Sequence, residues 1–377
     1  MIKRLLWLNG LGVLGAVINH ASGWGFTALF WWTDRYWGGS VPNFSQLGSA
    51  SYYGLRVMEQ VIMFSIPAFL FVSGFFIAFA TGRNRETVAW SVVGNRVKNL
   101  LIPYLIWSVV IFAMNAALRW IDDPTQRILG TPLGYLQNLL FGRTAAPYYY
   151  VPLITQLFLL SPLLVPLAKK QWKPLLLVTG LLLLLVSLSR YAVILEMDMP
   201  IAEQILRLTP AWFFPQSVFW FAVGLASGFH LPVFKAWLAR WKWVLLGATA
   251  VSFFLALFEW EFLFHQSGAE WLTPTRTLLD EVYSGAFLFT FLAFDKFNLP
   301  LAKFWSDLGT KSFGIYLVHA PVLEFVARAS YHYFPQVLAY QILLMPLLIV
   351  CGVAVPLLLM ALVNRSAIRP YYQTIFG

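Results

Sequence analysis

Two histidines in apolar surroundings are the residues of this sequence best suited to move a proton. His20 follows Asn19 near the end of a run built from Leu, Val, Gly and Ala, and His319 lies inside a second apolar run. A neutral imidazole accepts protons near neutral pH, so either ring could act as a general base. Either could equally be a structural histidine that hydrogen-bonds to a neighbouring helix, and both interpretations remain open.

Arg56 and Glu59 form a second polar group, at the start of another apolar stretch. Three residues separate them, so on a helix they share a face and can pair. A structural ion pair is the ordinary interpretation, and contact with a ligand is the alternative. The sequence contains no close-spaced metal-ligand cluster, Gly-x-Ser-x-Gly turn, phosphate-binding glycine loop or paired carboxylates, so we expect no metal site and none of the common soluble-enzyme sites.

The elements that must position these residues are membrane helices. Of the 377 residues 59% are hydrophobic and only 11% are charged, which leaves too little polar surface for a soluble globule. A membrane-crossing helix needs about 20 mainly apolar residues. Ten stretches qualify: 5–22, 59–80, 100–118, 150–168, 175–188, 212–229, 243–258, 277–294, 308–327 and 337–363. The sequence predicts an all-α membrane protein with a single domain over residues 1–377, a bundle of about ten transmembrane helices.

The charges predict the orientation of this bundle. With both termini cytoplasmic, every lysine falls on the inner side, as the preference of Lys and Arg for cytoplasmic loops requires. The net charge of +10 is then explained by topology, and no nucleic-acid partner is expected. The first apolar run continues to Trp31 and Trp32 without a cleavage site, so we expect it to be retained as a span. The one cysteine, Cys351, cannot form an intramolecular disulfide.

The loops offer two candidate binding regions. The inner loop 81–98 contains Arg83, Arg85, Arg96 and Lys98 against the single acid Glu86, which fits either an orientation signal or a site for an anionic ligand. The outer loops 23–58 and 119–149 are rich in aromatic residues. These aromatics could anchor the protein at the membrane interface or stack on a sugar.

Four strings of residues, in order along the chain, resemble segments of the acyltransferase-3 family of membrane proteins. Residues 67–75 are similar to the family's Pro-x-Phe-Phe-x-x-Ser-Gly-Phe segment, and residues 101–107, which follow the basic residues at 96–98, are similar to Leu-Ile-Pro-Tyr-Leu-Ile-Trp. Residues 149–157 resemble the start of the family's fourth span. Residues 308–321 resemble its late string Leu-Gly-x-x-Ser-aromatic-x-x-Tyr-Leu-x-His-x-Pro.

This resemblance implies a multi-pass protein of the bacterial inner membrane, surrounded by membrane lipids. It implies transfer of an acyl group, acetyl in the first instance, from cytoplasmic acyl-coenzyme A to a hydroxyl of a cell-surface saccharide or glycolipid. His20 would be the general base or a transient acyl acceptor. Arg96 and Lys98, supported by Arg83 and Arg85, would bind the phosphates of the donor.

The first span keeps only half of the family's signature. The family has Asp-Gly-Leu-Arg with a histidine eleven residues after the arginine; His20 takes the histidine position, but Asn9 stands at the arginine. About three helical turns place Asn9 and His20 on one face, roughly 16 Å apart, so we expect Asn9 to contact the donor's approach path. Arg4 could replace the missing arginine in space.

Other residues and other functions also remain open. His319, Arg56, Glu59 and Arg143 are candidates for the cavity or the acceptor site. A transporter or flippase would also suit about ten helices with polar residues at mid-depth, although no paired repeats are evident. The missing arginine would also fit an inactive member of the family.

Overall fold

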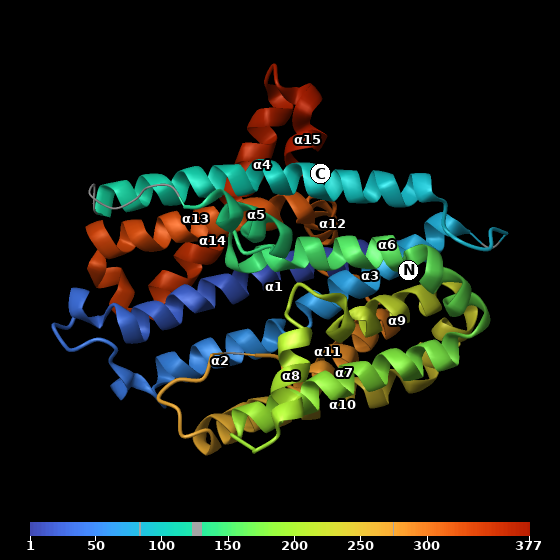
Figure 1. The fold of residues 1–377 in the computed structure, drawn as a ribbon, viewed down its shortest axis with the longest axis horizontal. Coiled ribbons are helices and arrows are strands. Elements are labelled where there is room, and N and C mark those ends of the chain that lie inside the picture. The colour runs from blue at the N-terminus through green and yellow to red at the C-terminus, as the bar shows by residue number, and fades with distance from the viewer. Residues whose placement is uncertain (83, 123–129, 274) are drawn as a thin grey trace.

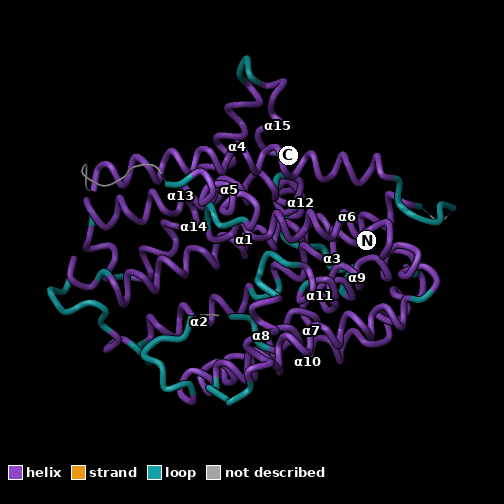
Figure 2. Tube along the Cα trace, in the orientation of Figure 1, coloured by secondary structure: helices purple, strands orange, loops and turns teal. Residues whose placement is uncertain are grey.

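The protein is all-helical in the computed structural model, which describes residues 1–82, 84–122, 130–273 and 275–377 (Figure 2). Within these ranges seven segments are long and apolar enough to cross a membrane. They are Ile2–Trp31, Ala50–Thr81, Trp90–Leu118, Ala146–Lys170, Trp172–Ile194, Leu231–Gln266 and Gln341–Arg365. The prediction of a helical membrane protein is confirmed, and seven of the ten predicted spans fall on these segments.

The other three predicted spans, 212–229, 277–294 and 308–327, also fall on helices. They correspond to α9 (Val218–Phe229), α11 (Leu278–Ala293) and α13 (Ser312–Tyr333). At 1.5 Å per residue, the 12 residues of α9 and the 16 of α11 are shorter than a hydrocarbon core of about 30 Å. Helix α13 has 22 residues but includes charged ones. The total of ten spans therefore stays a prediction.

The long helices run across the view in Figure 1. Its right-hand end holds the N-terminus, the loop after α3 and the turn between α6 and α7, whereas the loops after α1 and α10 lie at the left-hand end. The remaining bounds are α1 Ile2–Phe26, α2 Ala50–Ile62, α3 Ser65–Thr81, α4 Trp90–Asp122, α5 Pro132–Phe141, α6 Tyr150–Lys170, α7 Trp172–Ile194, α8 Pro200–Leu208, α10 Leu231–Gln266, α12 Ala302–Thr310, α14 Gln341–Arg365 and α15 Tyr372–Phe376.

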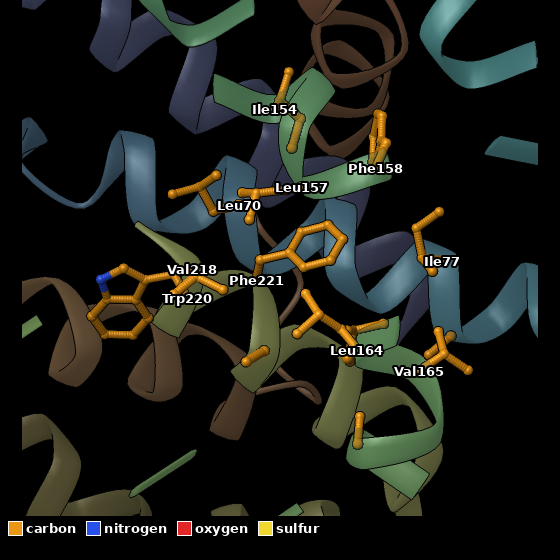
Figure 3. Close-up of a cluster of buried hydrophobic side chains, with 14 of the residues drawn as sticks. Leu70, Ile77, Ile154, Leu157, Phe158, Leu164, Val165, Val218, Trp220 and Phe221 are labelled. Carbon is orange, nitrogen blue, oxygen red and sulfur yellow. The ribbon is translucent and has the colours of Figure 1, made fainter. Parts of the chain in front are cut away.

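Helices α3 and α9 approach each other closely because a glycine on each helix faces the backbone of the other helix. A Cβ atom on Gly74 would overlap the carbonyl oxygen of Phe221, and one on Gly224 would overlap that of Phe71. Small residues allow such close approach in membrane bundles, where packing and not water exclusion drives association. Figure 3 shows the apolar cluster around this contact, with Leu70 of α3 and Leu157 of α6 close to α9.

The predicted span 59–80 is divided between two helices, α2 and α3. Pro67 lies in the first turn of α3, where its ring has no N–H for the carbonyl of Met63 and would clash with it in a continuous helix. The Ser65 hydroxyl donates to the Ile62 carbonyl at 2.7 Å and supports the turn. Because α2 begins at Ala50, the predicted loop 23–58 is shorter than expected. Similarly, the predicted loop 119–149 contains α5.

Candidate active site

His20 and His319 are neighbours where α1 packs against α13. Their ring centroids are 5.3 Å apart, with the ring planes inclined by 41°. His319 is fully buried, whereas His20 is partly accessible. The two histidines that the sequence singles out separately therefore belong to one site.

The hydrogen bonds of His319 define which of its nitrogens is free. Its Nδ1 donates to the backbone carbonyl of Tyr316 at 2.6 Å, because a carbonyl oxygen can only accept. In the neutral ring Nε2 is then an acceptor, and this buried atom has no hydrogen-bond partner in the described part of the chain. His20 also makes no hydrogen bond to another described residue. Both imidazoles therefore have an unpartnered nitrogen, but only His20 lines a cavity; His319 lies behind it and lines none of the cavities described below.

A cavity of about 190 Å³, here called the central cavity, lies against His20. It is enclosed by α1, by the turn between α2 and α3, by the segment leading into α6, by Tyr316 and by the segment before α11. Its polar lining residues include Asn19, His20, Glu59, Tyr149, Tyr150 and Arg276. A polar patch within an otherwise apolar cavity is typical of small-ligand sites.

Two further cavities adjoin the central cavity along the bundle. The outer cavity, about 630 Å³, shares Asn19, His20 and Glu59 with it and extends past Thr27 to Glu324. The inner cavity, about 130 Å³, extends to Asn9 and Ser312. The residues common to the inner and central cavities are Phe69, Tyr150 and Tyr316. His20 therefore borders both the outer and the central cavity, and three aromatic side chains separate the central cavity from the inner one.

The ion pair expected between Arg56 and Glu59 is present. The two side chains are 2.5 Å apart and almost fully buried, and Glu59 also accepts a hydrogen bond of 3.0 Å from Ser22. The Arg56 guanidinium lies 4.1 Å from the centroid of the Trp260 ring, a cation–π contact. Glu59 borders the central and outer cavities, whereas Arg56 borders neither.

At the inner cavity the structure brings Asn9 and Arg96 into the same region. The Oδ1 atom of Asn9 is buried there without a hydrogen-bond partner in the described ranges. The guanidinium of Arg96 lies 5.6 Å from the ring centroid of Phe158, which lines this cavity. Arg4 does not substitute for the missing arginine. Its guanidinium donates to the carbonyl of Phe294 and contacts the Phe291 ring at the end of α11.

The other predicted binding residues are spread over the surface. Lys98 is exposed two positions after Arg96, and residues two apart on a helix do not share a face. Arg85 is exposed, and its carbonyl accepts a hydrogen bond from Lys169.

Arg143 is exposed, and its guanidinium lies over the ring of Phe141, away from the three cavities. Arg83 lies outside the described residues. The ligand roles of these residues stay predictions.

A side cavity of about 230 Å³ contains polar residues that the sequence analysis did not single out. Arg276 pairs with Glu281 at 2.6 Å, and Trp220 donates to the same carboxylate oxygen at 2.7 Å. Arg190 donates to the backbone carbonyl of Arg276 at 2.8 Å and to the side chain of Gln216. This cavity shares Ile66, Tyr149, Thr275 and Arg276 with the central cavity.

Part of this group had a signal in the sequence. Glu281 lies inside a predicted span, and Arg190 lies two residues beyond the predicted end of another, so both are charges at membrane depth or close to it. Arg276 lies one residue before the predicted span 277–294, so its position carried the same signal as that of Arg190. What the sequence did not show is that these three charged residues, from two predicted spans, would meet. The capping box of α11, in which Thr277 and Asp280 exchange side chain to backbone hydrogen bonds, fixes the position of Arg276 immediately before the helix.

Among the described residues, seven apolar segments long enough to cross a membrane, with cavities between them, define a multi-pass integral membrane protein. The sequence matches the family model described as an acyltransferase domain, that of the acyltransferase-3 family, over residues 3–365. This chain belongs to that family and is a membrane acyltransferase that uses an acyl donor. No curated protein and no solved structure matches the chain.

Proposed function

We propose that this acyltransferase moves an acyl group, acetyl in the first instance, from cytoplasmic acyl-coenzyme A to a hydroxyl of a saccharide or glycolipid. The observation that carries the proposal is the position of His20 on the wall shared by the outer and central cavities. An acceptor that enters the outer cavity and an acyl group that enters through the inner one would meet beside this imidazole.

The reaction needs a base and a stabiliser for the tetrahedral oxyanion. In the proposed mechanism His20 takes the proton of the acceptor hydroxyl as its oxygen attacks the thioester carbonyl. Collapse of the intermediate breaks the carbon–sulfur bond, and the proton passes from the imidazolium to the departing thiolate. Asn19, next to His20 on the same two cavities, could donate a hydrogen bond to the oxyanion.

The donor's acyl arm would reach the site through the inner cavity. Asn9, with its unpartnered side-chain oxygen, and Arg96, beside Phe158, are the residues best placed to contact the donor there. Arginine binds phosphate oxygens through two parallel hydrogen bonds, so Arg96 is the better of the two for a phosphate. Lys98 and Arg85 are exposed and would contribute positive charge at the surface.

The proposal includes the topology. With both termini cytoplasmic and ten spans in a bacterial plasma membrane, the basic loop 81–98 and every lysine face the coenzyme A pool. The outer cavity, which opens near the segment after α1, would then face the saccharide on the other side. The short helices α9 and α11 are the spans on which the total of ten depends.

The decisive experiment measures acyl-coenzyme A consumption by the purified, detergent-solubilised protein in the presence of a panel of saccharides. We expect His20→Ala to reduce turnover by about 10²–10⁴-fold, the usual contribution of a general base. His332→Ala is the matched control, because His332 is exposed and its aromatic contacts among the described residues are with the adjacent Tyr331 and Tyr333. This control should keep full turnover.

Two outcomes would contradict the proposal. Equal turnover in the wild type and in a folded His20→Ala variant would exclude His20 as the base. No thioester consumption and no coenzyme A binding by the wild type would favour a transporter or an inactive family member. A covalently acylated His20 trapped after rapid quenching would instead show that the imidazole carries the acyl group itself.

A further inference from the structure

The side cavity contains more positive than negative charge among the side chains that line it. Arg190, Arg276 and Glu281 are its ionisable acid and base groups other than Tyr149. Glu281 pairs with Arg276 and is also held by Trp220. The two hydrogen bonds of Arg190 go to neutral oxygens, the carbonyl of Arg276 and the amide of Gln216. One guanidinium charge therefore has no ion-pair partner among the described residues.

The other carboxylates near the side cavity already have hydrogen-bond or ion-pair partners. Asp280, one residue before Glu281, accepts from the backbone N–H of Thr277 in the capping box of α11 and does not line the side cavity. Glu59 is bonded to Arg56 and Ser22. The Nε atom of Arg276 is buried and has no partner in the described part of the chain. Buried donors without partners are costly, and an anion in the cavity would satisfy them.

The position of the side cavity suits one end of an acceptor. It shares a wall with the central cavity, where Tyr149 and Arg276 border both spaces. His20 borders the same central cavity. Its arginines come from the C-terminal part of α7 and from the segment between α10 and α11, elements that reach the end of the bundle opposite the N-terminus (Figure 1). A ligand held here by one group can present another to His20.

We infer that the side cavity selects acceptors that bear an anionic group, a carboxylate or a phosphate attached to a sugar, with Arg190 and Arg276 as its ligands. This inference rests on the proposed function, since it concerns the acceptor of that reaction. Guanidinium groups bind planar carboxylates and phosphates through paired, charge-assisted hydrogen bonds. The hydroxyl to be acylated would lie on the part of the sugar that extends into the central cavity.

The test measures binding and needs no turnover. Three probes are titrated into the purified wild type while tryptophan fluorescence and the melting temperature are followed: methyl β-glucuronide, glucose 6-phosphate and the neutral methyl β-glucoside. We expect an anionic probe to bind about tenfold more tightly than the neutral one, in line with the strength of a charge-assisted pair. Arg190→Gln should abolish this preference, whereas Arg207→Gln, an exposed control on α8, should keep it.

Arg190→Lys extends the test if the glutamine variant is unstable. It keeps the charge but loses the paired geometry, so part of the preference should remain. A preference for the glucuronide alone identifies a carboxylate, and a preference for the phosphate alone identifies a phosphate. The inference is overturned if the wild type does not distinguish anionic from neutral probes, or if folded Arg190→Gln still does. Anion preference without acyl-coenzyme A consumption would reject the proposed transfer but leave the anion site in place.

Discussion

Glu59 links two buried polar side chains beside the outer and central cavities. It accepts from Arg56 at 2.5 Å and from Ser22 at 3.0 Å, and the guanidinium of Arg56 in turn packs on Trp260. A paired buried charge is largely compensated, whereas a single one left without its partner is strongly destabilising. The two charges should therefore be replaceable together but not separately.

A double-mutant cycle tests this dependence. Glu59→Leu should lower the free energy of unfolding by about 3–5 kcal/mol, because Arg56 is left buried and unpaired. The double variant Arg56→Met, Glu59→Leu should lose much less, since both charges are removed. Denaturant or thermal unfolding of the detergent-solubilised protein gives the four stabilities. Losses that simply add would show that the two side chains do not interact.

At the scale of elements, the contact between α3 and α9 fixes the position of α3, which lines the inner and central cavities. Phe69 and Ser73 of α3 line the inner cavity, and Ser65 and Ile66, the first two residues of α3, line the central one. Gly74 and Gly224 set how closely α9 approaches the other face of this helix. A larger residue at either position would have to separate the two backbones.

The glycine contact can be tested with the smallest available change. Gly224→Ala should destabilise the protein by about 1–3 kcal/mol, because the added methyl meets the Phe71 carbonyl oxygen and the core cannot expand freely. Gly247→Ala on α10 is the control: no atom lies within 4 Å of its added Cβ, and loss of a helical glycine should be neutral or slightly stabilising. Equal melting temperatures for the two variants would refute close packing at Gly224.

At the scale of the whole molecule, the proposed donor and acceptor paths require opposite ends of the bundle to face opposite sides of the membrane. Lys98 lies near the N-terminal end of α4, and Arg207 lies on α8, which follows α7. Both side chains are exposed. They can therefore report the orientation of the two ends independently.

Cysteine labelling measures this orientation. In a Cys351→Ser background, which removes the one native thiol, we expect Lys98→Cys to react with a membrane-impermeant maleimide only in inverted vesicles. Arg207→Cys should react only in vesicles of native orientation, because in the proposed topology α7 carries the chain to the outer side. Reaction of both from the same side would reject the proposed topology.

Local features of the sequence predicted a large part of this organisation. All ten predicted apolar stretches fall on helices, and the family strings identify the family that the domain match shows. The boundary between α2 and α3 was missed because hydropathy does not register the backbone conflict that Pro67 introduces. Hydropathy also did not decide whether the number of spans is ten, because short helices such as α9 are stabilised by packing against their neighbours.

The sequence by itself determined the membrane class, the helical spans, the family and the choice of His20. These follow from composition and from short strings of residues, which are local features and do not depend on contacts between distant parts of the chain. Only the tertiary structure brought His319 to His20, placed His20 on the wall of two cavities, and joined Arg190, Arg276 and Glu281 in one group. The physical reason is that cavities and buried ion pairs depend on which helices touch. In a membrane that choice is made by small residues and buried polar groups far apart in the chain.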